Sequence, residues 1–302
     1  MPFYPGWTYQ PDDIAAAVER MARAGMLMTS AGALSFHGEW SRRVSAGETA
    51  FIASTVEPDK PPAYCQSTGV CTSMLYRSLQ DCLNWDRVKN GAINRPVKLC
   101  FETLFAGSRI AIGRGQLGYS DGSIGAWIAE YVARFGVLER GIYHGTDLSR
   151  PREDLAQAWG QPRAGVPQII EVLSHNHRFL AHKCESTDEL ADGIAAGCFG
   201  GICRSHYTHV IDSERFAVFG NYGGHHTCLR GAFIDRRSNK RVFVEQQTHG
   251  SGVPDSHPVA HTTDGDVELS DGAYLVREND IARFIGNGEV WIFQPMLGEE
   301  YR

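Results

Sequence analysis

Apolar residues recur at helical spacing in four stretches of the chain, and each stretch predicts an amphipathic helix with one buried face. The stretches are residues 14–22, 71–83, 124–135 and 186–197. Local signals support two of them: Gly136 is a C-terminal stop after the third, and Ser186 with Glu189 fits a capping box that starts the fourth. Prolines interrupt residues 147–173, where an insertion with short helices is expected.

The pattern changes after Gly197, where short β-rich segments alternate with turn residues. These segments are residues 199–203, 216–219, 226–233, 242–245, 274–276 and 290–293, and residues 50–56 are also expected to be extended. Helices thus dominate the first half of the chain and strands the second. That order predicts an α+β fold and argues against alternating βαβ units.

Three prolines among residues 57–62 mark a boundary between an N-terminal extension, residues 1–58, and a main domain, residues 59–302. The extension is expected to hold the first helix and an extended arm. That helix is too short to form a core of its own, so its apolar face must cover something. It covers either the back of the main domain or another subunit of an assembly, viral or homo-oligomeric, and we expect the second.

Composition and charge exclude several classes of protein. The chain has 302 residues, of which 42% are hydrophobic, as in an ordinary globular protein. Its longest apolar runs are too short to cross a bilayer, and its first residues show no secretory signal, so synthesis in the cytoplasm is expected. A net charge of −6 gives no general electrostatic basis for binding nucleic acid.

Cysteine and histidine usage gives no support to a metal site. The chain has eight cysteines and no Cys-x-x-Cys pair, and without an export signal we expect reduced thiols and no disulfides. The paired histidines do not match a known ligand spacing with a carboxylate partner. These histidines are at positions 175, 177, 206, 209, 225 and 226. We therefore expect no metal and no other cofactor.

One glycine-containing loop carries the strongest chemical signal. Gln66-Ser-Thr-Gly-Val-Cys71 opens the second predicted helix and places a cysteine at its first turn. A helix N-terminus stabilises a thiolate, the reactive form of cysteine, and a glutamine on the same loop can donate a side-chain N–H to a developing oxyanion. An inert, buried Cys71 would fit this segment equally well.

A second signal lies at two neighbouring strands. His225 and His226 open one predicted strand, and Gln247 ends the next. A cysteine nucleophile needs a base, and the base needs an acceptor that orients it. If the two strands pair antiparallel, a histidine and the amide lie side by side. Taken singly, each histidine is better explained as an ordinary surface residue, since the chain has 12 histidines.

Together and in this order, these features resemble the papain-like cysteine peptidases. The resemblance covers about residues 62–280, and it extends beyond the loop, histidine and amide to three further segments. Residues 119–136 resemble the glycine-rich cleft segment and its helix, residues 187–203 the next helix and first barrel strand, and residues 272–276 the strand after the amide. The resemblance implies two lobes: a helical lobe at about 66–146, an insertion at about 147–173, and a β-barrel-like lobe at about 174–302.

The resemblance also implies a role for individual residues. Carried over by position, Cys71 matches the nucleophile and Gln66 the glutamine that binds the oxyanion. His225 matches the base, with His226 as the neighbouring alternative, and Gln247 stands in the place of the asparagine that orients the base. The residues implied to line the substrate cleft are Gly122, Ser123, Ile124 and Gly224.

The chain departs from the family pattern at several of these positions. Glutamine replaces the asparagine at Gln247, His249 replaces a tryptophan, and one residue fewer separates Gln66 from Cys71. Moving an amide by about an ångström can reduce a rate by about a hundredfold. Two functions are therefore open. The first is a cysteine peptidase, a hydrolase acting on a peptide or protein; the second is a weakly active or non-catalytic structural protein, such as a decoration, tail or cell-wall-degrading component of a phage virion.

Overall fold

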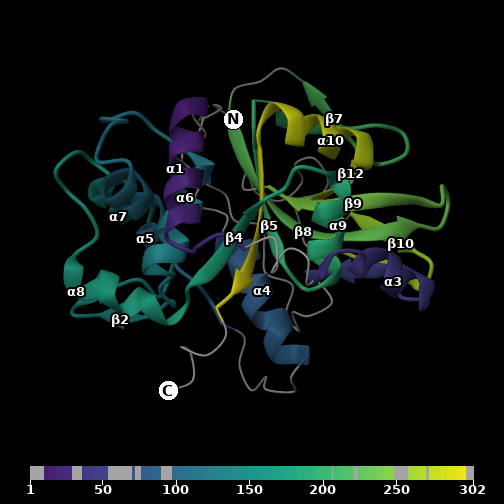
Figure 1. Ribbon diagram of the computed structural model, residues 1–302, viewed down its shortest axis with the longest axis horizontal. Helices are drawn as coiled ribbons and strands as arrows, with labels where there is room; N and C mark the ends of the chain where they lie inside the picture. The colour runs from purple at the N-terminus through teal and green to yellow at the C-terminus, as the bar shows by residue number, and fades with distance from the viewer. Residues whose placement is uncertain are drawn as a thin grey trace.

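The computed structural model describes residues 10–28, 36–53, 70–71, 76–89, 97–205, 207–220, 224–247, 258–269 and 272–296. Helices gather in one half of the molecule and an antiparallel sheet occupies the other, which confirms the α+β order expected from the sequence (Figure 1). None of the helices within these ranges is long and apolar enough to span a membrane.

The helical half surrounds one buried helix. This helix is α6 (Gly125–Phe135), in which nine consecutive residues from Gly125 to Ala133 are buried, and the chain leaves it at Gly136 with a φ of 76°. The other elements of this half are α5 (Glu102–Gly107), the π-helix η3 (Ser108–Ile112), β2 (Ile142–Tyr143), β3 (Thr146–Asp147), α7 (Glu153–Trp159), α8 (Gln168–Glu171) and the 3₁₀-helix η4 (Val172–Asn176).

The other half is a sheet that has nine strands among the described residues, with order β11-β10-β8-β5-β13-β4; β1 and β9 also pair with β8, and β12 pairs with β9. The strands are β1 (Ala50–Ile52), β4 (Phe179–Lys183), β5 (Phe199–Arg204), β8 (His225–Asp235), β9 (Lys240–Gln246), β10 (Val259–Thr262), β11 (Gly265–Glu268), β12 (Ala273–Arg277) and β13 (Glu289–Pro295). A separate hairpin joins β6 (Tyr207–Ile211) to β7 (Ala217–Gly220).

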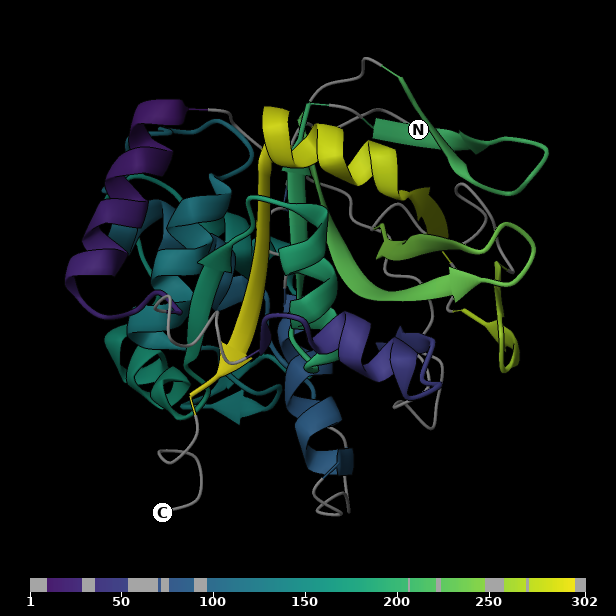
Figure 2. The same cartoon turned by 45° about the vertical axis from the view of Figure 1, so that its right-hand side comes forward.

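Three described helices besides α6 pack on this sheet. They are α4 (Tyr76–Lys89), α9 (Thr187–Ala195) and α10 (Glu278–Asn287). Helix α4 contacts β5, β8 and β13, and in Figure 2 it lies below the yellow strand β13, where the two halves meet. Helix α9 starts as its capping box predicts, because the backbone N–H of Glu189 donates to the Ser186 hydroxyl at 3.1 Å.

The extension is part of the same folded unit. Helix α1 (Pro11–Arg23) packs on α6 and buries Ile14, Ala17 and Met21 there, while its Arg20 guanidinium pairs with the Glu130 carboxylate at 2.8 Å. Farther along, α3 (Glu39–Ser45) packs on α9, and β1 pairs with β8. The expectation that this apolar face docks on another subunit is therefore not supported, because the face is buried within the chain.

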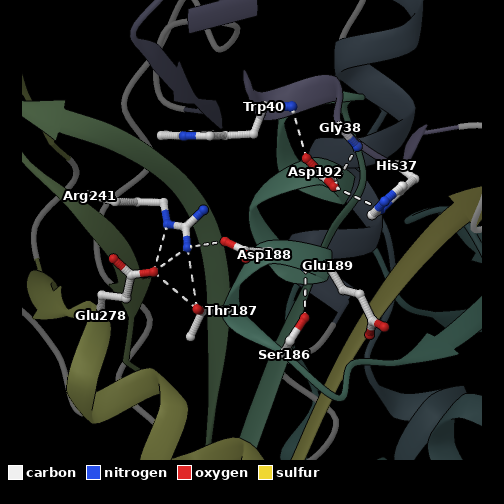
Figure 3. Close-up of polar contacts among 10 residues, drawn as sticks. All are labelled: His37, Gly38, Trp40, Ser186, Thr187, Asp188, Glu189, Asp192, Arg241 and Glu278. Carbon is white, nitrogen blue, oxygen red and sulfur yellow. Dashed lines mark hydrogen bonds and ion pairs between the residues drawn. The ribbon is translucent and has the colours of Figure 1, made fainter. Parts of the chain in front are cut away.

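A network of polar contacts fixes α3 on the sheet half (Figure 3). The Asp192 carboxylate, on α9, accepts hydrogen bonds from the backbone N–H groups of Gly38 at 2.7 Å and Trp40 at 3.0 Å, at the start of α3. On the other side of α9, Arg241 pairs with Glu278 and with Asp188. Asp192 thus caps a helix that lies far from it in sequence.

Replacing Asp192 with alanine is expected to lower the free energy of unfolding by about 1–2 kcal/mol, since one buried and one partly buried backbone donor lose a charged acceptor. Urea denaturation measures the loss, and hydrogen exchange should localise it to residues 36–45. Asp188→Ala on the same helix is the control, because the Asp188 side chain is 80% exposed and its ion pair is expected to contribute less than about 1 kcal/mol. Equal losses in the two variants would contradict the capping role.

Candidate active site

Cys71 lies five residues before the first residue of α4, the helix that packs on β5, β8 and β13. Cys71 and its neighbour Val70 have no exposed surface. The apolar face predicted for this helix is confirmed where it is described, because Leu79, Cys82 and Leu83 are buried on α4. The sequence predicts that this helix begins at Cys71; residues 72–75, which follow it, and the oxyanion candidate Gln66 lie outside the described residues.

His225 and Gln247 come from neighbouring strand ends, as the sequence predicts. His225 is the first residue of β8, and Gln247 directly follows β9. The two strands pair antiparallel with Cys228 opposite Gln246. The start of β8 therefore lies next to the end of β9, at the same end of the sheet. The backbone N–H of Gln247 donates to the carbonyl of Gly272 at 3.2 Å, which fixes the chain just beyond β9.

The register places the two histidines on opposite faces of β8. Side chains alternate along a strand, so His225 shares its face with Thr227, and His226 with Cys228. Thr227 donates a hydrogen bond to Glu245 of β9 at 2.7 Å, and alternation puts Gln247 on the face of Glu245. His225 and Gln247 therefore belong to one face, and His226 to the other.

The face of β8 that carries His226 is the one nearer to Cys71, through the residues paired with His226. Opposite His226 on β5 is Cys203, and opposite Cys203 on β13 is Glu289. The Glu289 carboxylate accepts hydrogen bonds from the backbone N–H of Gly125 at 3.2 Å and from the indole N–H of Trp291 at 3.0 Å. This buried carboxylate sits at the N-terminus of α6, where the helix dipole favours a negative charge.

The thiol of Cys71 lies close enough to Cys203 to affect the ionisation of Cys203. Burial raises the pKa of Cys203 well above its usual range, and the Glu289 carboxylate and the Cys71 thiol raise it further. Cys203 is therefore a protonated, unreactive neighbour of Cys71. Burial likewise raises the pKa of Cys198 and of Cys228 to about 12.

The face of His225 holds a fully buried ion pair that the sequence did not reveal. Arg204, the register partner of His225, donates to Glu245 at 2.7 Å, to the Tyr274 hydroxyl at 2.9 Å and to Thr227 at 3.1 Å. Burial lowers the pKa of the Arg204 guanidinium, but Glu245 and Tyr274 outweigh burial and raise it above its ordinary value.

Two aromatic rings complete the surroundings of this guanidinium. It lies 4.7 Å from the ring centre of Phe219 and 4.4 Å from that of Phe284. With these rings and hydrogen bonds around it, the Arg204 guanidinium forms a rigid support beside the predicted base and its orienting amide.

The predicted cleft segment lies at the start of α6. Gly122 has a φ of 87°, which suits glycine, and its carbonyl accepts a hydrogen bond from the buried Arg109 guanidinium. The Ser123 hydroxyl bonds that of Ser108 at 2.8 Å, and Ile124 is the fully buried N-cap residue of α6. Gly224, predicted to line the same cleft, directly precedes β8.

The candidate residues are closed off from solvent. Cys71 and His225 have no exposed surface, and His226 and Gln247 are each 1% exposed. A substrate can reach Cys71 only if the atoms that cover it move.

The described residues hold no group of three side chains that could bind a metal ion. Four histidines within the described ranges instead pair with a carboxylate: His177 with Glu139 at 2.7 Å, His182 with Glu189 at 3.2 Å, His261 with Asp266 at 2.7 Å and His37 with Asp192 at 3.6 Å. None of the seven described cysteines forms a disulfide, and Cys65 lies outside the described residues.

Comparison with solved structures identifies the fold. The structure is similar to that of xylellain, a cysteine protease from Xylella fastidiosa, with a TM-score of 0.51 and 14% sequence identity over 97% of this chain and 92% of that one. The chain has the papain-like cysteine protease fold. Digestive procathepsin L2 from Tenebrio molitor larvae also matches, with a TM-score of 0.48 and 14% identity over 83% of this chain and 68% of that one. No protein family profile and no curated protein sequence matches the chain.

The order of the candidate residues along the chain is the basis of the sequence resemblance. That resemblance does not account for the Arg204–Glu245 pair or for Glu289, which sequence reasoning missed. The sequence did hold a signal for Arg204 and Glu245, since each of these charged residues ends or interrupts an apolar strand. Only the strand register shows that they meet.

Proposed function

We propose that the protein is a cysteine peptidase that hydrolyses a peptide or amide bond through Cys71, His225 and Gln247. The Cys71 thiolate attacks the carbonyl carbon of the substrate. His225 takes up the thiol proton and later delivers it to the leaving amine, while the side-chain oxygen of Gln247 accepts the other imidazole N–H. Gln66 and the backbone N–H of Cys71 stabilise the oxyanion, and water then hydrolyses the thioester.

One observation carries this proposal. In a papain-like fold, the register puts His225 and Gln247 on the same sheet face and at the same sheet edge, as a base and its orienting acceptor require. The Arg204–Glu245 pair supports that arrangement, because it fixes the side chains next to His225 on this face. Cys203, the neighbour of Cys71, lies opposite His226 and shares its face, so the position of the nucleophile favours His226, the alternative base.

Separate replacement of the two histidines tests which of them is the base. His225→Ala is expected to lower kcat/KM on a denatured protein substrate by at least about a hundredfold, because general-base catalysis is lost. His226→Ala, the matched control one residue along the same strand, is expected to change it less than about tenfold. Circular dichroism should show that both variants are folded. The opposite ranking would transfer the role of base to His226 and contradict the proposed triad.

A second candidate function is a papain-like protein with little or no catalysis. The observation that favours it is the complete burial of Cys71 and His225, which leaves no open path to the sulfur. This candidate predicts no cleavage of peptides and slow alkylation of Cys71 by iodoacetamide in the native state. An assembly role in a phage particle remains a prediction from the sequence resemblance alone.

A further inference from the structure

A cavity lies against α6, and none of the candidate catalytic residues lines it. It has a volume of about 210 Å³ and lies between α1, α6 and the segment that includes the end of η3. Its lining residues are Asp13, Arg20, Ala111, Ile112, Arg114, Gln116, Trp127, Glu130 and Arg134. None of them belongs to the candidate active site, so the proposed peptidase function leaves this cavity unexplained.

The charges around the cavity do not cancel. Three guanidinium groups face two carboxylates, which leaves one excess positive charge. Glu130 is 1% exposed, and its two oxygens are already occupied by Arg20 at 2.8–3.1 Å and by Arg134 at 3.2 Å. Arg114, in contrast, is exposed and forms no ion pair or side-chain hydrogen bond with any described residue. Its charge is available to a ligand.

The backbone beside the cavity is unusual in two respects. The residues of η3 form a π-helix, a rare conformation that is frequent at functional sites. Arg114, two residues after it, has a φ of 51°, a conformation that L-residues other than asparagine and aspartate seldom adopt. Between them, Gly113 passes so close to Trp127 that an added Cβ would lie 2.2 Å from the indole ring. The chain therefore holds the arginine at the mouth of the cavity at a conformational cost.

The apolar part of the lining sets the second property of a ligand. Ile112 and the buried indole of Trp127 belong to it, and they provide an apolar surface next to the cationic groups. A planar guanidinium binds a carboxylate through two parallel hydrogen bonds, and a single negative charge matches the single excess positive charge. The volume is large enough for several waters or for one small organic molecule.

We propose that this cavity binds a small carboxylate that carries an apolar group, with Arg114 as its charge partner and Trp127 against its apolar group. Such a ligand contacts α1 as well as α6, because Asp13 and Arg20 come from the extension. Its binding therefore stabilises the docking of the extension on the helical half. This inference does not rest on the proposed peptidase function.

Isothermal titration of the full chain with phenylacetate tests the site, with phenylacetamide as the neutral ligand of the same shape. Phenylacetate is expected to bind at least about tenfold more tightly than phenylacetamide. Arg114→Asn should abolish that difference while the chain stays folded, because asparagine tolerates the positive φ. Arg150→Asn is the matched control: it removes an equally exposed arginine elsewhere and should leave the difference unchanged.

Three results would each overturn the proposal. One is equal affinity for phenylacetate and phenylacetamide, or no binding of phenylacetate at about 10 mM. The second is an unchanged affinity in Arg114→Asn. The third is binding of inorganic phosphate as tight as that of phenylacetate, because the apolar wall would then contribute nothing.

Discussion

Replacement of Cys71 by alanine is expected to lower kcat/KM on any peptide substrate by about ten-thousandfold, because no other group in the site supplies a nucleophile. The change removes one sulfur atom from a buried position, so the variant should remain folded. The measurement is the rate of cleavage of a denatured protein or a mixed peptide library, together with a thermal melt of each variant.

The matched control is Cys198→Ala, another buried cysteine. Burial raises the pKa of Cys198 to about 12, so it stays protonated at neutral pH and its loss should leave activity within about twofold. Equal activity in Cys71→Ala and the unmodified protein would eliminate the proposed mechanism. Absence of activity in every form, with slow alkylation of Cys71, would instead support the non-catalytic candidate.

Replacement of Arg204 by methionine is expected to lower the free energy of unfolding by about 3–5 kcal/mol. Methionine fills much of the same volume, but Glu245 would keep its buried charge without its main partner. Urea denaturation monitored by tryptophan fluorescence measures the change.

Two further variants separate charge from packing. Arg277→Met removes a half-exposed arginine paired with Asp212 and Glu214, and it should cost less than about 1 kcal/mol. Adding Glu245→Gln to Arg204→Met should recover part of the lost free energy of unfolding, since it removes the unpaired buried charge of Glu245. If the single and double variants were equally unstable, packing and not the ion pair would explain the effect.

Much of the fold could be predicted because its signals are local. The Ser186 cap, the stripe of apolar residues in α6 and the stop at Gly136 each depend on residues within a few positions of one another. Segment α5 was missed for the opposite reason: all six of its residues are buried, so its sequence has no polar face to mark a helical period. Helix α10 had such a signal in Ile281 and Phe284, three positions apart and both buried, but it was overlooked.

The sequence supplied candidate residues for the site and not their arrangement. The order of histidine and amide along the chain predicted that they lie on two neighbouring strands, and β8 and β9 do pair antiparallel. Which face each histidine takes depends on strand register, which no local pattern specifies. The Arg204–Glu245 pair joins residues 41 positions apart, so it becomes visible only when β5, β8 and β9 are aligned.

Strand β1 has a consequence for any shorter form of the protein. It lies along β8 with Ile52 opposite Gly231, on the side of β8 beyond the last β5 pair at Leu229. Gly231 leaves the space that β1 needs, since an added Cβ there would lie 2.5 Å from the carbonyl oxygen of Phe51. A chain that began after residue 53 would therefore lack β1, and the backbone groups of β8 that pair with β1 would have no partner strand. Such an open edge templates strand addition between molecules, so the truncated chain is expected to aggregate rather than to fold as a smaller domain.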